Sequence, residues 1–168
     1  KIKITPSLRY NKNSTEDFKN NVYFPWSIID EKSILQSFEI LLKKLEPKSL
    51  NYLNIKIHPV SVNLKHQLSL KKKLENLFVK NNDKFGNKDK NTSIFIGSTT
   101  GIIVALEKNL DVFHLCFDPM FESYSEKMWP HLKVKKINDN IFVYNLKKKN
   151  TFINFGDGDS SFNQYYDI

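Results

Sequence analysis

The residues best suited to chemistry in this chain form a turn of small side chains, Gly97-Ser98-Thr99-Thr100-Gly101. The turn follows a short apolar run, Ile94–Ile96, and precedes an apolar stretch with helical spacing. A helix that begins near Thr100 leaves its first backbone N–H groups unpaired, and such groups favour an anion. The sequence therefore predicts a phosphate site at this turn. A plain helix cap by Ser98 or Thr99 is the open alternative.

The second candidate is His58, which ends the strand-like run Tyr52–Ile57 and is followed by Pro59. In open α/β sheets, ligands bind beyond the carboxyl ends of the parallel strands. An imidazole at that position can donate a hydrogen bond to a phosphate oxygen. We expect His58 to contact the phosphate and Pro59 to lie beside the nucleoside. The alternative is a loop histidine that bonds only within the protein.

Three further residues follow strand-like runs and are candidates for nucleoside binding: Ser27, Glu122 and Tyr124. The carboxylate of Glu122 could accept hydrogen bonds from ribose hydroxyls, and the ring of Tyr124 could stack on a base. Two alternatives remain open. Glu122 could be an ordinary first-turn carboxylate of a short helix through Trp129, and Tyr124 could be a packing residue.

Strand-like and helix-like patterns alternate along the chain, which positions these candidates at one edge of a sheet. Alternation of this kind predicts an α/β fold, a Rossmann-like parallel sheet with right-handed crossovers and helices on both faces. Asp30 is a good N-cap for the first helix, and Asn109 can end the third helix in a left-handed conformation. Strands are predicted over 22–24, 52–57, 94–96 and 112–117, helices over 30–45, 64–80 and 100–109, and shorter strands over 133–143 and 151–155.

Composition narrows the function classes. The chain has 168 residues and 40% hydrophobic content, which suits one folded domain, and no apolar run approaches the ~20 residues of a membrane span. The single cysteine, Cys116, lies in an apolar strand and is predicted to be a core residue in a reducing cytoplasm. The net charge of +8 is spread over the chain, and the clusters 71–73 and 147–149 lack interleaved aromatic residues. We therefore expect solvated lysines and no nucleic-acid partner.

Residues 1–21 are interpreted as a lead-in or linker segment, residues 22–155 as a Rossmann-like lobe that carries the candidate sites, and residues 156–168 as a C-terminal tail. Because the chain begins at Lys1 with a strand-like segment, we expect a fragment of a longer protein or a processed chain. The run 156–159, Gly-Asp-Gly-Asp, faintly resembles a calcium loop but lacks the carboxylate at the twelfth position, so no metal site is predicted.

Four segments together resemble the C-terminal, nucleotide-sugar-binding lobe of bacterial GT-B-type glycosyltransferases. They are IKIHP with its His-Pro pair, GSTTG with its Ser/Thr pattern, ALEKNLDVFHLCFDP, and SLRY. The resemblance covers most of residues 1 to 155. It is closest to the sialyltransferase-like and surface-polysaccharide enzymes that use CMP-activated sugars, such as sialic acid, related nonulosonates or Kdo.

The resemblance implies a transferase in which His58 is catalytic, binding the donor phosphate together with Gly97, Ser98, Thr99, Thr100 and Gly101. It implies no divalent metal or other cofactor. The acceptor, a glycan or glycolipid, and the general base would belong to an N-terminal lobe for which this chain has no room. Relatives carry a ribose-binding glutamate in the helix after the turn. This chain has Val104 near that position, which leaves Glu122 as the substitute.

The single cysteine is compatible with a cytoplasmic protein, and the basic charge leaves peripheral contact with the anionic inner leaflet of the membrane as an open alternative. Three other functions stay open. The first is a related transferase that uses CDP-glycerol or CDP-ribitol to build a polymer, and the second is a non-catalytic module that binds nucleotides or anions. The third is an epimerase of the same two-lobe architecture.

Overall fold

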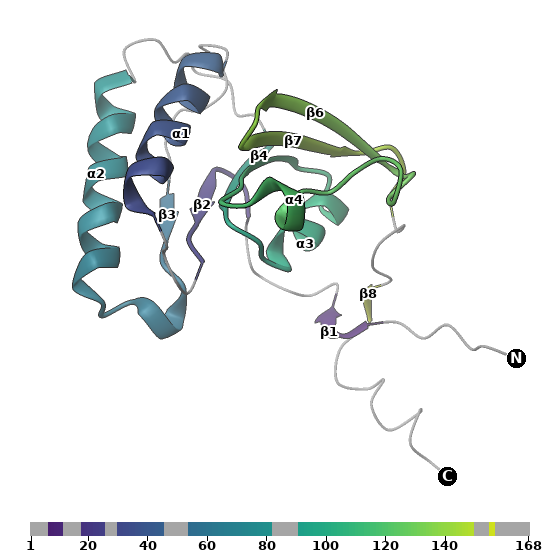
Figure 1. Ribbon diagram of the computed structural model, residues 1–168. Helices are drawn as coiled ribbons and strands as arrows, with labels where there is room; N and C mark the ends of the chain where they lie inside the picture. Colours follow the sequence, from purple (N-terminus) through teal and green to yellow (C-terminus); the bar gives the residue numbers. More distant parts are fainter. Residues whose placement is uncertain are drawn as a thin grey trace, which may run out of the picture.

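The centre of the molecule is a six-stranded sheet with the strand order β3-β2-β4-β5-β7-β6 (Figure 1). The computed structural model describes residues 7–11, 18–25, 30–45, 54–81, 91–149 and 155–156. The strands are β1 (Ser7–Asn11), β2 (Asn21–Tyr23), β3 (Asn54–Lys56), β4 (Thr92–Ile96), β5 (Asp111–Leu115), β6 (Leu132–Asn138), β7 (Ile141–Leu146) and β8 (Phe155–Gly156). The helices are α1 (Glu31–Lys44), the 3₁₀ turn η1 (Pro59–Ser61), α2 (Lys65–Asn81), α3 (Gly101–Glu107) and α4 (Pro119–Glu122).

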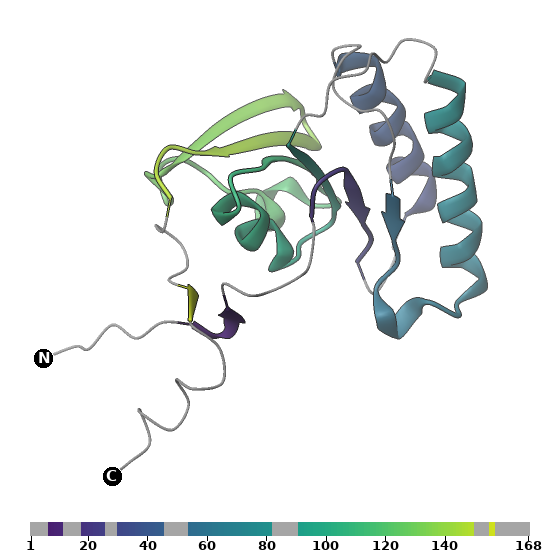
Figure 2. The same ribbon diagram turned by 180° about the vertical axis from the view of Figure 1, so that it is seen from behind.

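Helices cover both faces of this sheet, as the sequence predicts (Figures 1 and 2). Because side chains alternate along a strand, each central strand contributes to two separate cores. Val22, Ile94 and Leu115 pack toward α1 and α2 in one buried cluster. Phe95 and Val112 pack with α3 in the other cluster. The fold is therefore a Rossmann-like α/β arrangement of three layers.

The four strands β3, β2, β4 and β5 run parallel, which confirms the predicted parallel core. From β2 the chain crosses to β3 on one side, and it then returns past β2 to β4 on the other side. The direction of winding therefore reverses between β2 and β4. At such a switch point the two loops that leave the carboxyl ends separate, and open α/β sheets bind ligands there.

The remaining two strands of the sheet make it mixed rather than wholly parallel. β6 and β7 form an antiparallel hairpin, and β7 pairs antiparallel with β5 through His114↔Phe142 and its neighbours. The hairpin turns at Asp139 and Asn140. β8 pairs in parallel with β1 in a small separate sheet, which lies apart from the main one in Figures 1 and 2.

Two local signals in the sequence are confirmed in atomic detail. Asp30 caps α1, because its Oδ1 accepts a hydrogen bond from the backbone N–H of Ser33 at 3.1 Å. Asn109 has a φ of +64° two residues beyond the end of α3, the left-handed conformation that asparagine tolerates. In both cases the signal depends only on residues within one helical turn.

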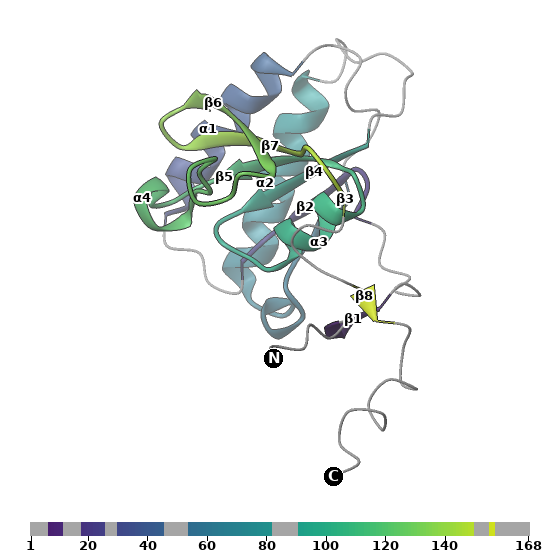
Figure 3. The ribbon, with the colours of Figure 1, turned by 90° about the vertical axis from the view of Figure 1, so that its right-hand side faces the viewer.

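The segment after β5 differs from the helix through Trp129 that was one alternative for it. α4 ends at Glu122, because Ser123 is extended with a ψ of 145° and its N–H bonds back to the carbonyl of Pro119. Figure 3 shows this short helix at the margin of the molecule. Glu122 is thus the last residue of a four-residue helix rather than the first-turn carboxylate of a longer one.

Replacing the cap of α1 should weaken the fold measurably. We expect Asp30→Ala to lower the free energy of unfolding by about 1 kcal/mol, because the N–H of Ser33 loses its acceptor. The urea midpoint measures the effect. Asp30→Asn is the matched control, since the amide oxygen can still accept this bond. Equal midpoints for the alanine variant and the unmodified chain would show that the cap contributes nothing.

Across the described residues, the structure has no helix that combines the length and the apolar character required to cross a membrane.

Candidate functional site

The turn after β4 leaves the sheet through a backbone conformation that requires glycine. Gly97 has a φ of +70°, and its N–H donates to the carbonyl of Leu115 at 2.8 Å. A β-carbon at this position would lie 2.7 Å from Cε2 of Phe117 and 3.5 Å from Cβ of Pro25. Gly97 therefore sits directly at the switch point, between the chain leaving β2 and the chain leaving β5.

Beyond Gly97 the turn presents polar groups at its surface. Ser98 and Thr100 are exposed, and Thr99 is half-buried. Oγ1 of Thr99 accepts from the N–H of Gly101 at 3.3 Å, so this hydroxyl does act as a local cap, the alternative given above. Within the described residues, the N–H groups of Ser98, Thr99 and Thr100 pair with no protein acceptor. The turn thus combines a cap with unpaired donors next to it.

His58 lies at the exit of β3, on the outer side of β2. Its ring is exposed, and its Nδ1 accepts from the N–H of Val60 at 3.3 Å. In the neutral imidazole the proton is therefore on Nε2, which faces solvent as a donor. Two strand spacings, or about 10 Å, separate the exits of β3 and β4. His58 and the Gly97 turn thus lie at the same edge of the sheet. They are not on neighbouring strands, because β2 lies between β3 and β4. Pro59 is also exposed and opens η1.

The other nucleoside candidates differ in where their side chains lie. Ser27 falls outside the described residues. Oε2 of Glu122 accepts from the N–H of Phe117 at 2.9 Å, so this oxygen is turned toward the end of β5. The ring of Tyr124 packs edge-on against Tyr144, with centroids 5.5 Å apart. Both side chains are half-buried, and their proposed contacts with ribose and base stay predictions.

Beneath the turn lies a buried polar cluster at the end of β5, built from His114, Cys116 and Tyr144. Nε2 of His114 is 3.0 Å from the carbonyl oxygen of Gly97, which can only accept, so Nε2 carries the proton. Nδ1 is then an acceptor, and it lies 3.3 Å from the hydroxyl of Tyr144 and 3.4 Å from Sγ of Cys116. The N–H of Tyr124 donates to the Tyr144 hydroxyl at 3.2 Å.

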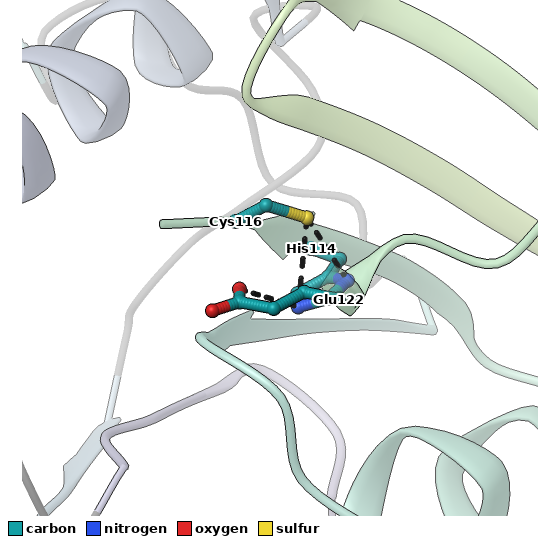
Figure 4. Close-up of side chains that lie close together, drawn as sticks. All are labelled: His114, Cys116 and Glu122. Carbon is teal, nitrogen blue, oxygen red and sulfur yellow. Dashed lines mark hydrogen bonds and ion pairs between the residues drawn. The ribbon is translucent and has the colours of Figure 1, made fainter. Parts of the chain in front are cut away.

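Glu122 completes the cluster from the side of α4. Its Oε2 is 3.9 Å from Nε2 of His114, and 16% of its side chain remains exposed. Figure 4 shows the thiol of Cys116 and the carboxylate of Glu122 both directed toward the imidazole ring. The cluster is therefore closed toward the core and open to solvent only near Glu122.

Burial dominates the electrostatics of these groups. It lowers the pKa of His114 to about 4, although the hydrogen bond to the Gly97 carbonyl acts in the opposite direction. Burial, with the negative charges of Glu122 and Asp118, raises the pKa of the Cys116 thiol to about 12. Burial also raises the pKa of Glu122, against its backbone hydrogen bonds. A neutral imidazole and a protonated thiol follow at neutral pH, so Cys116 is no nucleophile.

The sequence analysis assigned Cys116 correctly to the core but gave no role to His114 or Tyr144. One signal was available: His114 and Cys116 are two residues apart in a strand, which places both on the same face. Their contact with Tyr144 depends on the register of β7 against β5, where Val112 pairs with Tyr144. No pattern within the β5 segment reports that register.

The arrangement as a whole offers donors for an anion at the carboxyl edge and a rigid, hydrogen-bonded support below them. The support reaches the turn through the contact between His114 and Gly97. Comparison of this chain with protein-family models, with curated proteins and with solved structures found no significant match.

Proposed function

We propose that this chain is the nucleotide-sugar-binding lobe of a glycosyltransferase, and that the donor phosphate binds at the Gly97–Gly101 turn. The observation that carries the proposal is the position of this turn. It leaves β4 at the point where the winding of the sheet reverses, and it presents N–H groups that no described residue pairs, beside the hydroxyls of Ser98 and Thr100. Donors grouped at a switch point are the usual setting for a phosphate in this class of fold.

The chemistry of glycosyl transfer fits such a site. The bond between sugar and phosphate breaks more readily when hydrogen-bond donors stabilise the charge that develops on the phosphate oxygens. Fixed backbone N–H groups do this without reorganising. His58 would add a donor from the outer strand, because its Nδ1 is already occupied by Val60 and its Nε2–H points to solvent. The acceptor and the general base would come from a second lobe, as the resemblance implies.

The nucleotide preference follows from the resemblance to transferases that use CMP-activated sugars. The direct test is the thermal stability of the full chain with CMP, CDP, UMP, GDP or ADP in excess. A ligand at ~100 times its dissociation constant contributes roughly 2.7 kcal/mol, which raises the melting temperature by about 5–10 °C. We expect CMP to stabilise the chain most. If none of the five nucleotides raises the melting temperature above that of the chain alone, binding by this lobe is contradicted.

Two variants locate the binding. We expect the double variant S98A/T100A to lose at least half of the stabilisation by CMP, because both exposed hydroxyls are removed while the cap by Thr99 remains. His58→Ala should weaken CMP binding about tenfold, in line with a hydrogen bond to a charged group. His66→Ala is the control, since His66 is exposed on α2. If CMP stabilises both variants as strongly as it stabilises the unmodified chain, the binding site does not lie at this edge of the sheet.

The same assay distinguishes a CDP-glycerol or CDP-ribitol transferase from a transferase that uses a CMP-activated sugar. Stabilisation by CDP-glycerol beyond that by CMP would favour the polymer-forming reaction. Stabilisation by every anion alike, with strong dependence on salt, would favour a non-catalytic anion-binding module.

A further inference from the structure

The buried cluster beneath the turn has the composition of a metal site that is separate from the proposed donor site. His114, Cys116 and Glu122 each offer one ligand atom, and these atoms all lie within 4.8 Å of one another. His114 lies in β5, Cys116 directly follows that strand, and Glu122 is the last residue of α4, so the turn after β5 brings the carboxylate back to the other two. We propose that this cluster binds one Zn²⁺, or a similar first-row divalent cation, through Nδ1 of His114, Sγ of Cys116 and a carboxylate oxygen of Glu122.

The distance between the first two ligands already suits a tetrahedral ion. Bonds of about 2.0–2.1 Å to nitrogen and 2.3 Å to sulfur place the two ligand atoms about 3.5 Å apart at a tetrahedral angle. Nδ1 of His114 and Sγ of Cys116 are 3.4 Å apart. Sγ is also 3.8 Å from Nε2, so it lies over the face of the ring, and the side chains of His114 and Cys116 would rotate to share one ion. The metal would replace the contact between Nδ1 and the Tyr144 hydroxyl.

The outer hydrogen bonds that metal ligands need are also in place. The second nitrogen of a metal-bound histidine commonly donates to a backbone carbonyl, which fixes the tautomer that coordinates. Nε2 of His114 makes this contact with the carbonyl of Gly97 at 3.0 Å. Likewise, Oε2 of Glu122 is held by the N–H of Phe117 at 2.9 Å, and it approaches the ring at Nε2, 3.9 Å away, so the carboxylate would turn to meet an ion on Nδ1. The fourth position is open to water on the side where Glu122 reaches solvent.

The charges of the ligand set match those of a divalent cation. A bound divalent cation deprotonates a coordinating thiol, whose proton is released to solvent. One thiolate and one carboxylate then balance the two positive charges, with a neutral imidazole as the third ligand. The mixed nitrogen, sulfur and oxygen set suits zinc better than magnesium or calcium, which prefer oxygen ligands alone.

Cobalt titration gives the sharpest test, because the chain has a single cysteine. The full chain is reduced, stripped with a chelator that is then removed, and titrated with Co²⁺ alone. We expect a near-ultraviolet thiolate-to-cobalt charge-transfer absorption that saturates at one equivalent and is displaced by Zn²⁺. Any such absorption must come from Cys116. Zn²⁺ at ~100 times its dissociation constant should raise the melting temperature by about 5–10 °C.

Variants distinguish a metal site with several protein ligands from binding of the metal by the thiol alone. Cys116→Ser should lose the absorption, and Glu122→Gln should weaken Co²⁺ binding by at least the roughly 10–100-fold seen when an outer partner is removed. His131→Ala is the control, because this exposed histidine lies outside the cluster. Far-ultraviolet circular dichroism verifies that each variant is folded. The proposal fails if the folded chain shows no charge-transfer band, or if Glu122→Gln binds Co²⁺ as tightly as the unmodified chain. The readout involves no nucleotide, so it is independent of the proposed transferase function.

Discussion

Replacing Gly97 with alanine should lower the free energy of unfolding by about 3 kcal/mol. Two causes add. A side chain at a φ of +70° costs about 1–2 kcal/mol, and the new β-carbon would lie 2.7 Å from the ring of Phe117, a contact that must be relieved by movement in a packed region. Urea unfolding of the two proteins measures the difference. The same change should abolish nucleotide binding if the turn holds the phosphate, since the backbone donors would shift.

The control for Gly97→Ala measures the cost of a positive φ alone, without the contact with Phe117. Asn109 also has a positive φ, +64°, but it is exposed. Asn109→Ala should therefore cost only about 1 kcal/mol, because it adds no atom and meets no crowded ring. If both variants lose the same stability, the contact with Phe117 is easily relieved and the larger figure is wrong.

Acidification should destabilise the metal-free chain through His114. Its pKa is about 4 in the folded protein and 6.5 when unperturbed, so the unfolded state binds the proton more tightly. The corresponding stability is fully present above about pH 6.5, and about 3 kcal/mol of it is lost as the pH falls to 4. Urea unfolding across this range, with a chelator present, measures the slope. The other titratable groups that face the ring are Cys116, Glu122 and Tyr144.

His114→Leu supplies the comparison for the acid effect. Because the substitution also changes the absolute stability, the quantity to compare is the change in the free energy of unfolding between pH 7 and pH 4. We expect that change to shrink by about 3 kcal/mol in His114→Leu and to stay as it is in His131→Ala, whose ring is exposed. An unaltered slope in His114→Leu would show that carboxyl groups elsewhere cause the acid sensitivity.

The sequence was sufficient for features that depend on neighbouring residues. Asp30 and Asn109 mark a helix start and a helix end through bonds within their own turns, and both are confirmed. The alternation of strands and helices likewise implied the parallel core and the two covered faces, because a crossover between parallel strands needs a helix to bridge them. The glycine at the head of the turn was also visible, since few residues tolerate its conformation.

Contacts between distant segments could not be predicted in the same way. The hydroxyl of Tyr144 meets His114 only because the hairpin returns beside β5 in one particular register. Glu122 turns toward the end of β5 because α4 stops after four residues and the backbone N–H of Phe117 is within its reach. Pairing register and the length of a short helix both depend on tertiary packing, which local propensity does not report.

The pairing of β1 with β8 has a consequence for engineering. These two strands are hydrogen-bonded neighbours, so Ser7 and Phe155 lie side by side. A segment whose two ends lie together can be grafted into a surface loop of another protein, because its ends match the gap in the host. Residues 7–156 could thus be inserted as one segment. The fused host would then report any ligand binding to that segment through its own fluorescence or activity.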